Sequence, residues 1–245
     1  MPLLLALAAA HAWTVDTTAT GEPLRWIEMP IPWSFDADRA PALDDVHGAV
    51  EAAFDAWAWV DETDVSFVGE VTENVAATSE YDLVNLVYFD DAWPEDEPAL
   101  ALASTWSHPD GMLVGFDIRL DPTADWSTSG DADAYDLQAA LTHEIGHALG
   151  LEHSAVVDAT MYGVHARGED WRRELDADDE DALRHLYGQR SLEEAGSALL
   201  DGESISLAPD PRSASCGLSR PGGWTPLHGF FLLLSIRIRG RVTAG

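Results

Sequence analysis

The chain has 245 residues, of which 46% are hydrophobic, so it is long enough to bury one sizeable core. Its formal net charge of −31 comes from 44 acidic residues against 13 basic residues, and every basic residue is an arginine. This acidity argues against nucleic acid and anionic membranes as partners, so we expect the main body to bind neither.

The first predicted element is a signal peptide over residues 1–12. The run MPLLLALAAAHA is apolar and ends in Ala10-His11-Ala12, the small-x-small pattern of a secretory cleavage site. An apolar N-terminal strand is the alternative, because no Arg or Lys precedes the apolar run. The single cysteine, Cys216, excludes an internal disulfide framework. We therefore expect an exported protein whose stability comes from its core and from bound metal.

Five strand candidates follow in the next hundred residues, with one helix among them. The strand candidates are rich in β-branched and aromatic residues and are separated by turn-forming Asp, Gly, Pro and Asn. They cover residues 23–36, 65–71, 81–89, 99–106 and 112–120. Over residues 40–60, Val50 and Phe54 stand near helical spacing, which predicts an amphipathic helix. We expect a sheet accompanied by helices.

Two further helices complete the predicted domain. Residues 135–149 place Leu141 and Ile145 toward the core, and Gly150 is a natural stop for this helix. Residues 176–188 begin with acidic side chains, which the dipole of a helix favours at its N-terminus. Past this helix the hydrophobic periodicity fades, so we expect one folded domain over residues 13–190.

The sequence HEIGHALGLEH, which begins at His143, carries the chemistry. His143 and His147 are four residues apart, so they project from one face of a helix. Gly150 lets the chain turn, after which His153 can return as a third imidazole. Three neutral nitrogen ligands leave one tetrahedral position open for water, which is the arrangement of catalytic zinc. Glu144 stands next to the first ligand, where it can reach that water.

The length of the motif separates a metal site from histidines that merely pack in a helix. A bare H-E-x-x-H arises by chance in about one chain in fifty of this composition. The full H-E-x-x-H-x-x-G-x-x-H arises in about one in ten thousand. The sequence therefore favours a zinc site over an ordinary buried helix.

The motif HEIGHALGLEHS, followed by ATMYG, resembles the metzincin metallopeptidases, and most closely the matrixin branch that contains the matrix metalloproteinases. The resemblance implies three zinc ligands, one general base, and one methionine in a tight turn beneath the metal. In that order, these residues are His143, His147 and His153, then Glu144, then Met161. The resemblance covers residues 23–188, as motifs in the last third and as a pattern of strands before it.

Two further expectations come from the resemblance. The stretch LDADDEDALRHLYG matches the closing helix of matrixins, which implies that Asp178 and Asp179 brace the Met161 turn and the N-terminal segment. Acids that merely start a helix are the alternative. Matrixins commonly carry a second, structural zinc, but here Ser104 stands near the place of one of its histidines and only His108 is available. We expect that second zinc to be absent.

The position after Met161 is also a departure from some metzincins. Astacin-like and serralysin-like relatives place a zinc-binding tyrosine two positions after their methionine, where this chain has Gly163. Tyr162 is therefore expected to line a wall of the site rather than bind the metal.

The predicted fold is α+β and metzincin-like, a twisted mixed sheet with an active-site helix and a C-terminal helix, and zinc in the cleft between subdomains. The predicted function is that of a secreted or surface-attached zinc endopeptidase, in which Glu144 takes the proton of a zinc-activated water. The resemblance implies that its partner is a protein or peptide substrate, which lies extended along an edge strand; residues 99–104 are the candidate for this strand. We expect a monomer.

Other readings remain open for the function and for the metal. One is a non-catalytic zinc-binding surface module, and another is an enzyme that hydrolyses something other than protein. The aspartate clusters either keep the surface solvated or hold calcium as an additional cofactor. Retention of Glu144 favours an enzyme over a module that only binds zinc.

The C-terminal region predicts attachment to a bacterial envelope. A polar linker over residues 191–211 precedes a tail over residues 212–245, which contains Cys216, an apolar run at 230–236 and arginines at 237–241. This order resembles the tripartite C-terminal sorting signals of bacterial surface proteins. Two alternatives are that the Cys216 thiolate inhibits the zinc and that the tail is a frayed end.

Overall fold

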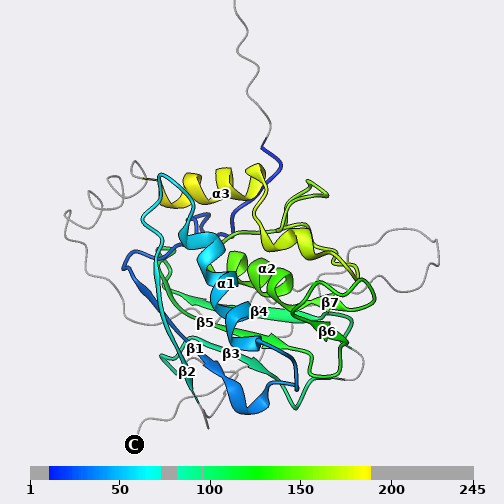
Figure 1. The fold of residues 1–245 in the computed structure, drawn as a ribbon. Coiled ribbons are helices and arrows are strands. Elements are labelled where there is room, and N and C mark those ends of the chain that lie inside the picture. Colours follow the sequence, from blue (N-terminus) through cyan, green and yellow to red (C-terminus); the bar gives the residue numbers. More distant parts are fainter. Residues whose placement is uncertain (1–10, 73–81, 95–96, 189–245) are drawn as a thin grey trace, which may run out of the picture.

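The computed structural model describes residues 11–72, 82–94 and 97–188, which form a mixed sheet packed against helices (Figure 1). The predicted linker and C-terminal tail lie outside the described residues, as do residues 1–10 of the predicted signal peptide. No helix within the described part of the chain is long and apolar enough to cross a membrane.

The sheet has five strands in the order β2-β1-β3-β5-β4. Their bounds are β1 (Ile31–Asp36), β2 (Phe67–Thr72), β3 (Leu86–Phe89), β4 (Ala101–Ser107) and β5 (Leu113–Leu120). Strand β1 runs parallel to both β2 and β3, and β3 runs parallel to β5. Strand β4 is antiparallel to β5 and lies at the edge of the sheet. This mixed sheet with helices confirms the predicted α+β fold class.

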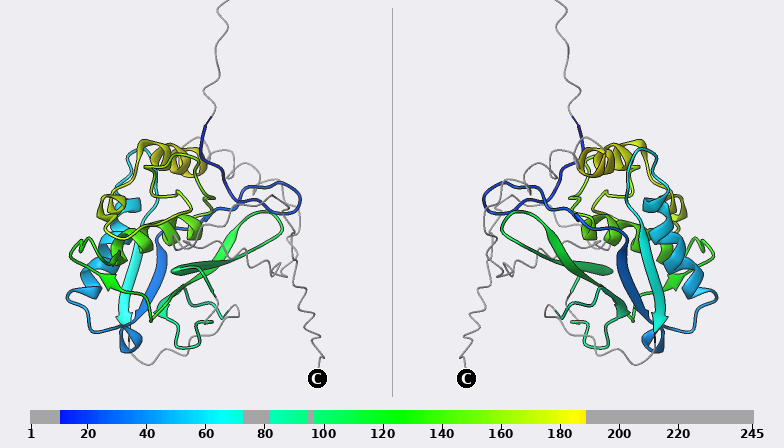
Figure 2. Two further views of the ribbon diagram at one scale, coloured as in Figure 1. Left: turned by 90° about the vertical axis from the view of Figure 1, so that its right-hand side faces the viewer. Right: turned by 90° about the vertical axis from the view of Figure 1, so that its left-hand side faces the viewer.

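Helices α1 and α2 lie against the same face of the sheet (Figures 1 and 2). The regular helices are α1 (Val46–Ala58), α2 (Leu137–Ala148) and α3 (Ala177–Tyr187). Shorter elements are the 3-10 helices η1 (Ala37–Arg39) and η2 (Asp170–Arg173), and a parallel pair of two-residue strands, β6 (Trp126–Ser127) and β7 (Tyr135–Asp136). The three predicted helices are confirmed, whereas the short elements were not anticipated.

Two predicted strands, those from residues 23 and 81, begin five or more residues later than expected, at Ile31 and Leu86. Residues 23–30 are not part of β1, although Leu24 and Trp26 are buried. Proline lacks the N–H that a strand ladder needs, and this stretch contains Pro23 and Pro30. Its backbone pairs through two isolated bridges, one between Pro23 and Thr17 and one between Arg25 and Met112.

The second late start is that of β3. The strand predicted from residue 81 begins at Leu86. Leu83 is 78% exposed and has a φ of 72°, a conformation that interrupts an extended strand. The apolar pattern of this stretch was therefore correct only for the part that enters the core.

An aromatic cluster joins α1 to the sheet. The ring of Phe54 stacks on Trp33 of β1, with centroids 4.3 Å apart and planes 10° apart. Phe67 of β2 and Phe116 of β5 approach the same ring at 5.0 Å and 6.4 Å. The indole N–H of Trp57 donates to the carbonyl of Thr142 in α2 at 2.8 Å. Helix α1 thus fixes the position of α2 above the sheet.

Replacement of Phe54 by alanine should lower the free energy of unfolding by about 3–5 kcal/mol, because it empties the centre of this cluster. Urea unfolding of the full chain measures the effect. Asp55→Ala, at the exposed neighbouring position, is the matched control and should change stability by less than about 0.5 kcal/mol. Equal stability of the two variants would show that the aromatic cluster does not hold α1 on the sheet.

Candidate metal centre

The N-terminus of α2 is fixed by a charged cap. The side chain of Asp136 accepts a hydrogen bond from the backbone N–H of Ala139 at 3.0 Å. Arg173 of η2 grips the same carboxylate with two bonds, from Nε at 2.9 Å and from Nη2 at 2.6 Å. Asp136 is buried, so this bidentate pair gives α2 a defined start.

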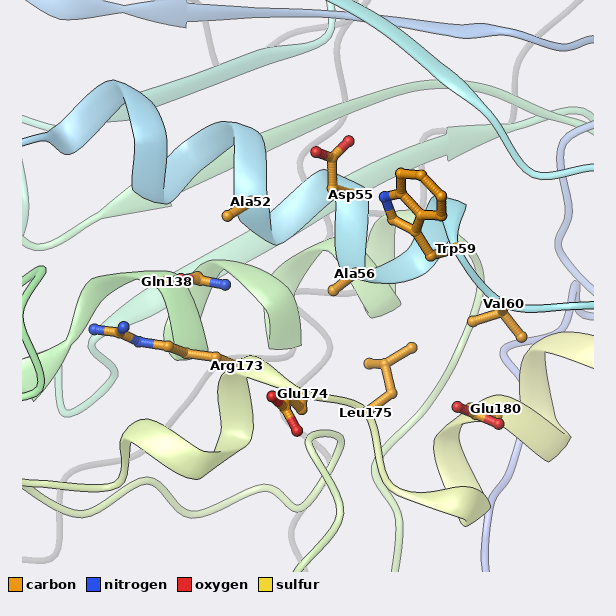
Figure 3. A pocket seen from close by; sticks show the side chains of 10 residues that line it. All are labelled: Ala52, Asp55, Ala56, Trp59, Val60, Gln138, Arg173, Glu174, Leu175 and Glu180. Carbon is orange, nitrogen blue, oxygen red and sulfur yellow. The ribbon is translucent and has the colours of Figure 1, made fainter.

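Arg173 also lines a pocket of about 450 Å³ between α1, α2 and the segment that leads into α3 (Figure 3). Gln138 of α2 and the exposed Trp59 lie at the same pocket. None of the residues predicted to bind zinc lines it. The pocket is therefore separate from the three histidines and lies beside the residues that hold α2 in place.

The end of α2 turns the chain back toward the helix. Gly150 has a φ of +92°, and a Cβ at this position would lie 2.2 Å from the carbonyl oxygen of Leu24. Backbone N–H groups of Gly150 and Leu151 close the turn by donating to His147 and Gly146 at 2.9 Å and 3.0 Å. Only glycine accommodates both the left-handed backbone and the close approach.

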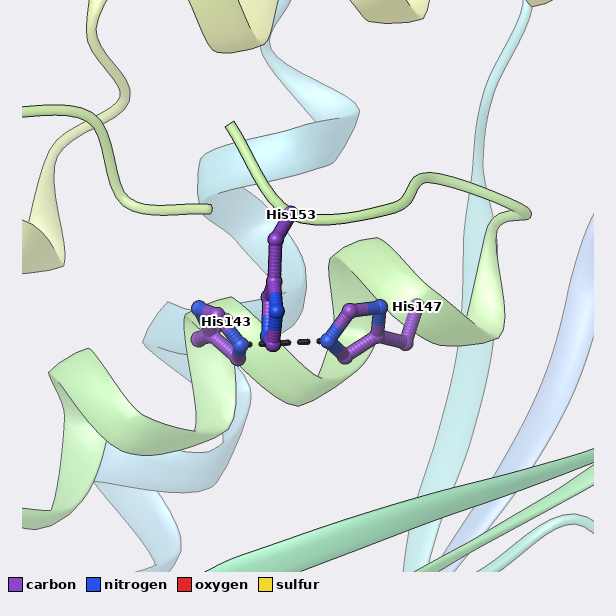
Figure 4. A group of neighbouring side chains, drawn as sticks. All are labelled: His143, His147 and His153. Carbon is purple, nitrogen blue, oxygen red and sulfur yellow. Dashed lines mark hydrogen bonds between the residues drawn. The ribbon is translucent and has the colours of Figure 1, made fainter. Parts of the chain in front are cut away.

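The turn places His153 beside the two histidines of α2 (Figure 4). Ring centroids of the three imidazoles are 4.8 to 5.1 Å apart, and one ligand atom from each lies within 4.8 Å of the others. His143 and His147 are buried, whereas His153 is half-buried. The structure therefore brings together the three residues that the motif singled out.

Backbone carbonyls determine which nitrogen of each helical imidazole carries the proton. His143 Nδ1 lies 2.7 Å from the carbonyl oxygen of Thr160, and His147 Nδ1 lies 2.7 Å from that of Leu151. A carbonyl only accepts, so each Nδ1 must donate. Both Nε2 atoms of the neutral rings are then lone-pair acceptors, and they face each other at 3.1 Å.

Burial keeps these rings neutral. It lowers the pKa of His143 well below its usual value and the pKa of His147 to about 3, and the neighbouring histidines act in the same direction. Burial also lowers the pKa of His153. Two lone pairs at 3.1 Å repel unless a cation lies between them, and nitrogens that share a tetrahedral zinc ion lie about 3.3 Å apart. The donor set thus fits zinc.

Glu144 is fully buried on α2, next to His143 in the chain. Burial of an ionisable carboxyl costs free energy, and such groups concentrate at functional sites. This buried carboxyl, one residue after His143, is therefore a candidate functional group.

Met161 lies buried against Gly146 of α2. A Cβ built on Gly146 would lie 2.2 Å from the Met161 sulfur and 2.9 Å from a ring carbon of Trp57. Gly146 therefore provides the space that Met161 occupies. This role was missed in the sequence, where Gly146 is simply an interior position of the motif.

Asp179 connects α3 to the turn that carries Met161. Its carboxylate accepts from the backbone N–H groups of Thr160 at 2.7 Å and Met161 at 3.0 Å. The same Thr160 accepts the Nδ1 proton of His143 through its carbonyl. Asp179 thereby positions the backbone of Thr160, whose carbonyl orients the imidazole of His143. Hydrogen bonds of this kind commonly orient the ligands of metal sites.

Asp178 contacts the turn that follows the third histidine. It accepts a hydrogen bond of 2.6 Å from the hydroxyl of Ser154. The N-terminal segment lies beside this turn, since residues 12–16 pair with residues 150–155 through backbone bonds of 2.8 to 3.2 Å. Thr14 also donates its hydroxyl proton to the carbonyl of His153 at 3.4 Å.

Tyr162 and Gly163 follow Met161 along the edge of the site. The guanidinium of Arg172 lies 5.5 Å from the centroid of the Tyr162 ring. A Cβ built on Gly163 would lie 2.7 Å from Nδ1 of His153, so glycine at this position leaves room for the third imidazole.

Arg172 is a second supporting residue that the sequence did not reveal. It is 2% exposed and donates to the carbonyls of Ala159 at 2.6 Å and Val157 at 2.8 Å. These bonds hold the loop that precedes Met161. Neither Arg172 nor Arg173 belongs to a recognisable motif, so only the folded structure assigns their partners.

The residues expected near a second zinc lie apart in the structure. Ser104 is on β4 opposite Asp117, and His108 is in the turn between β4 and β5. Within residues 11–72, 82–94 and 97–188, the three histidines are the one group of His, Cys, Asp or Glu placed to share an ion. The absence of a second zinc stays a prediction.

Comparison with known proteins matches this chain to one family model and to several metalloproteinases. A family model of the matrixins matches residues 25–188. Metalloendoproteinase 2-MMP of Arabidopsis thaliana is 29% identical over 191 residues, which cover 73% of this chain and 46% of the relative. Metalloendoproteinase 4-MMP of the same plant is 31% identical over 208 residues, or 81% of this chain and 58% of the relative. Human matrilysin is 35% identical over 101 residues, or 41% of this chain and 37% of the relative.

Replacement of Gly146 by alanine should destabilise the protein and weaken zinc binding. Alanine gains about 1 kcal/mol of helix propensity over glycine. Overpacking against Met161 and Trp57 costs about 1–3 kcal/mol, so the unfavourable effect should dominate. Gln138→Ala, at a half-buried position of the same helix, is the control. Zinc titration and thermal unfolding of both variants check this, and a Gly146→Ala protein as stable as the parent would contradict it.

Proposed function

The chain belongs to the matrixin family, and we propose that it is a zinc-dependent endopeptidase. The observation that carries the proposal is the convergence of three imidazoles beside the buried Glu144. Because the chain spans about half the length of the plant relatives it matches, its activity and substrates are argued from its own residues.

His143, His147 and His153 would hold the zinc ion through the nitrogens that face one another. When bound, zinc would lower the pKa of a water molecule toward neutrality and polarise the carbonyl of the scissile bond. The Nδ1 bonds of His143 and His147 keep their Nε2 lone pairs directed at the shared point. The three ligands are neutral, so the site keeps the full positive charge of the ion.

Glu144 would act as the general base. Its carboxylate oxygen accepts a proton from the attacking water and later returns that proton to the nitrogen of the leaving amine. Burial of Glu144 strengthens its interactions with nearby charge, because little solvent screens them. Met161 would support the site from below as an apolar contact that supplies no ligand.

An extended peptide would bind along strand β4. This strand lies at the edge of the sheet, where an added chain can form backbone hydrogen bonds. Leu102 and Ala103 are buried, so the strand itself is firmly seated. Binding of this kind reads the main chain of the substrate and suits a peptidase that acts on protein or peptide segments.

The same proposal includes the organisation of the whole chain. Residues 1–12 would direct export, residues 13–190 would form the catalytic domain, and residues 191–211 would link it to a tail at residues 212–245. The motivation is the small-x-small sequence at Ala12 and the succession of cysteine, apolar run and arginines in the tail. The working location would be the extracellular medium or the bacterial cell surface.

Substitution of Glu144 should separate chemistry from metal binding. Glu144→Ala should keep close to one zinc per chain, since this residue is assigned no bond to zinc. Its hydrolysis of casein should fall by at least about a hundredfold, the effect typical of losing a general acid-base group. His147→Ala should lose both metal and activity and unfold more readily.

Metal analysis and casein cleavage on the same samples measure both effects, with chelator treatment of the parent as the reference. His47→Phe, an exposed histidine on α1, is the control and should behave as the parent. Retention of most activity by Glu144→Ala would refute the general base. Absence of chelator-sensitive cleavage in a zinc-loaded parent would favour a non-catalytic surface module.

Truncation tests the proposed role of the tail. Full-length protein expressed in a suitable bacterial host should fractionate with the envelope and lose its extreme C-terminus. A chain that ends before Cys216 should instead leave the envelope fraction while retaining its zinc and activity. Unchanged location after truncation would contradict the sorting role.

A further inference from the structure

Arg173 of η2 contacts the start of α2 from outside the three-histidine motif. Its guanidinium donates to the carboxylate of Asp136 from Nε at 2.9 Å and from Nη2 at 2.6 Å. Asp136 is 1% exposed, and Figure 3 shows the Arg173 side chain extended beside Gln138 in the first turn of α2. A bidentate pair of this kind has a narrow range of geometries, so it fixes the start of α2 against η2.

The backbone on either side of Arg173 holds Thr160. The Thr160 hydroxyl shares its one proton between the carbonyls of Arg172 at 3.2 Å and Glu174 at 3.0 Å. Thr160 is 1% exposed, so water does not compete for these bonds. They act in addition to the bond that Asp179 makes with the Thr160 backbone. The η2 segment therefore positions Thr160 as well as α2.

Thr160 closes a ring of contacts that contains a predicted zinc ligand. Its carbonyl accepts the Nδ1 proton of His143 at 2.7 Å. His143 lies seven residues after Asp136, which is about 10 Å along α2. The ring runs from Asp136 along α2 to His143, across to Thr160, through the backbone around η2, and back by the side chain of Arg173. The position of the His143 imidazole against its carbonyl partner depends on every contact in this ring.

His147 lies outside the ring. Its Nδ1 donates to the carbonyl of Leu151 at 2.7 Å. Leu151 belongs to the turn that ends α2, where its backbone N–H donates to the carbonyl of Gly146 at 3.0 Å. The orientation of His147 is therefore set locally at the end of α2, whereas the orientation of His143 depends on η2.

We infer that Arg173 is a positioning residue of the metal centre, which orients His143 toward zinc through this ring of contacts. Arg173 is assigned no contact with the ion or with substrate. The inference rests on the proposed function, which assigns His143 to zinc. Loss of an outer contact of a metal ligand commonly weakens metal binding by about ten- to a hundredfold. An arginine that only stabilised the fold would leave the zinc affinity of the folded chain unchanged.

Zinc titration of the full chain against a fluorescent chelator tests this without any measurement of hydrolysis. Arg173→Leu should raise the zinc Kd at least about tenfold. Arg173→Lys keeps the charge but loses the paired geometry, so its Kd should lie between those of Arg173→Leu and the parent. Arg184→Leu removes an arginine that binds Glu180 on α3, and this matched control should keep the parent Kd.

Asp136→Asn distinguishes the ring from a simple helix cap. Asparagine caps a helix about as well as aspartate, so the start of α2 is retained, but the charged pair with Arg173 is lost. The ring predicts a raised Kd, as for Arg173→Leu, whereas a capping role alone predicts the parent Kd. Each Kd is measured at a temperature at which thermal unfolding shows the variant to be folded.

A double-mutant cycle tests whether the contacts act as one unit. Thr160→Val removes the hydroxyl but keeps the carbonyl that His143 uses, and it should also raise the Kd at least about tenfold. Either change opens the same ring, so Thr160→Val combined with Arg173→Leu should bind zinc within about threefold of the weaker single variant. Independent contacts would instead multiply to a loss of about a hundredfold.

The two imidazole protons provide a readout inside one molecule. Nuclear magnetic resonance of the chain with ¹⁵N-labelled histidine measures the exchange of each Nδ1 proton with water. In Arg173→Leu and Asp136→Asn, the proton of His143 should exchange at least about tenfold faster than in the parent, because its carbonyl partner is no longer held in place. The proton of His147 should exchange as in the parent.

Three results would overturn the inference. One is a parent Kd in Asp136→Asn and in the Arg173 variants that fold. Another is equal acceleration of both imidazole protons, which would indicate general loosening of α2. The third is multiplicative loss in the double variant. A parent that binds no zinc would remove the proposed function together with this inference, whereas a zinc-binding parent with unaffected variants would remove this inference alone.

Discussion

The candidate site depends on two hydrogen bonds, from Nδ1 of His143 and of His147 to backbone carbonyls. These bonds fix the tautomer of each buried ring and leave two lone pairs opposed at 3.1 Å. Two opposed lone pairs repel each other when nothing lies between them, whereas a cation between them attracts both. Both carbonyls lie outside α2, so the helix cannot create the site by itself, and the loops at Leu151 and Thr160 must hold their positions.

Those loops are held by residues from the last third of the domain. Asp179 at the start of α3 binds the backbone of Thr160 and Met161. Arg172 binds the carbonyls before that turn, and Arg173 binds the carboxylate that starts α2. Metal binding and folding are therefore coupled, because a ligand set assembled from separate segments exists only in the folded chain.

The sequence predicted the three histidines that lie together in the structure because their geometry is local. His143 and His147 are one helical turn apart, and Gly150 marks the turn that returns His153. The supporting contacts depend on tertiary structure and could not be predicted. The sequence does not distinguish an arginine that binds a buried carboxylate, as Arg173 binds Asp136, from an arginine that faces solvent. Residues 23–30 belong to the strand predicted over residues 23–36 because that stretch is rich in β-branched and aromatic residues, but the prolines of residues 23–30 restrict backbone pairing.

The pairing of residues 12–16 with residues 150–155 has a consequence for synthesis. Thr14 and His153, joined by a hydrogen bond, are 139 positions apart in the chain. A ribosome releases the first of these segments long before the second, and contacts of such separation form late because the intervening chain must be ordered first. A nascent chain that has not yet reached residues 150–155 therefore has no completed centre. The order of the segments delays assembly of the site until almost the whole domain has been made.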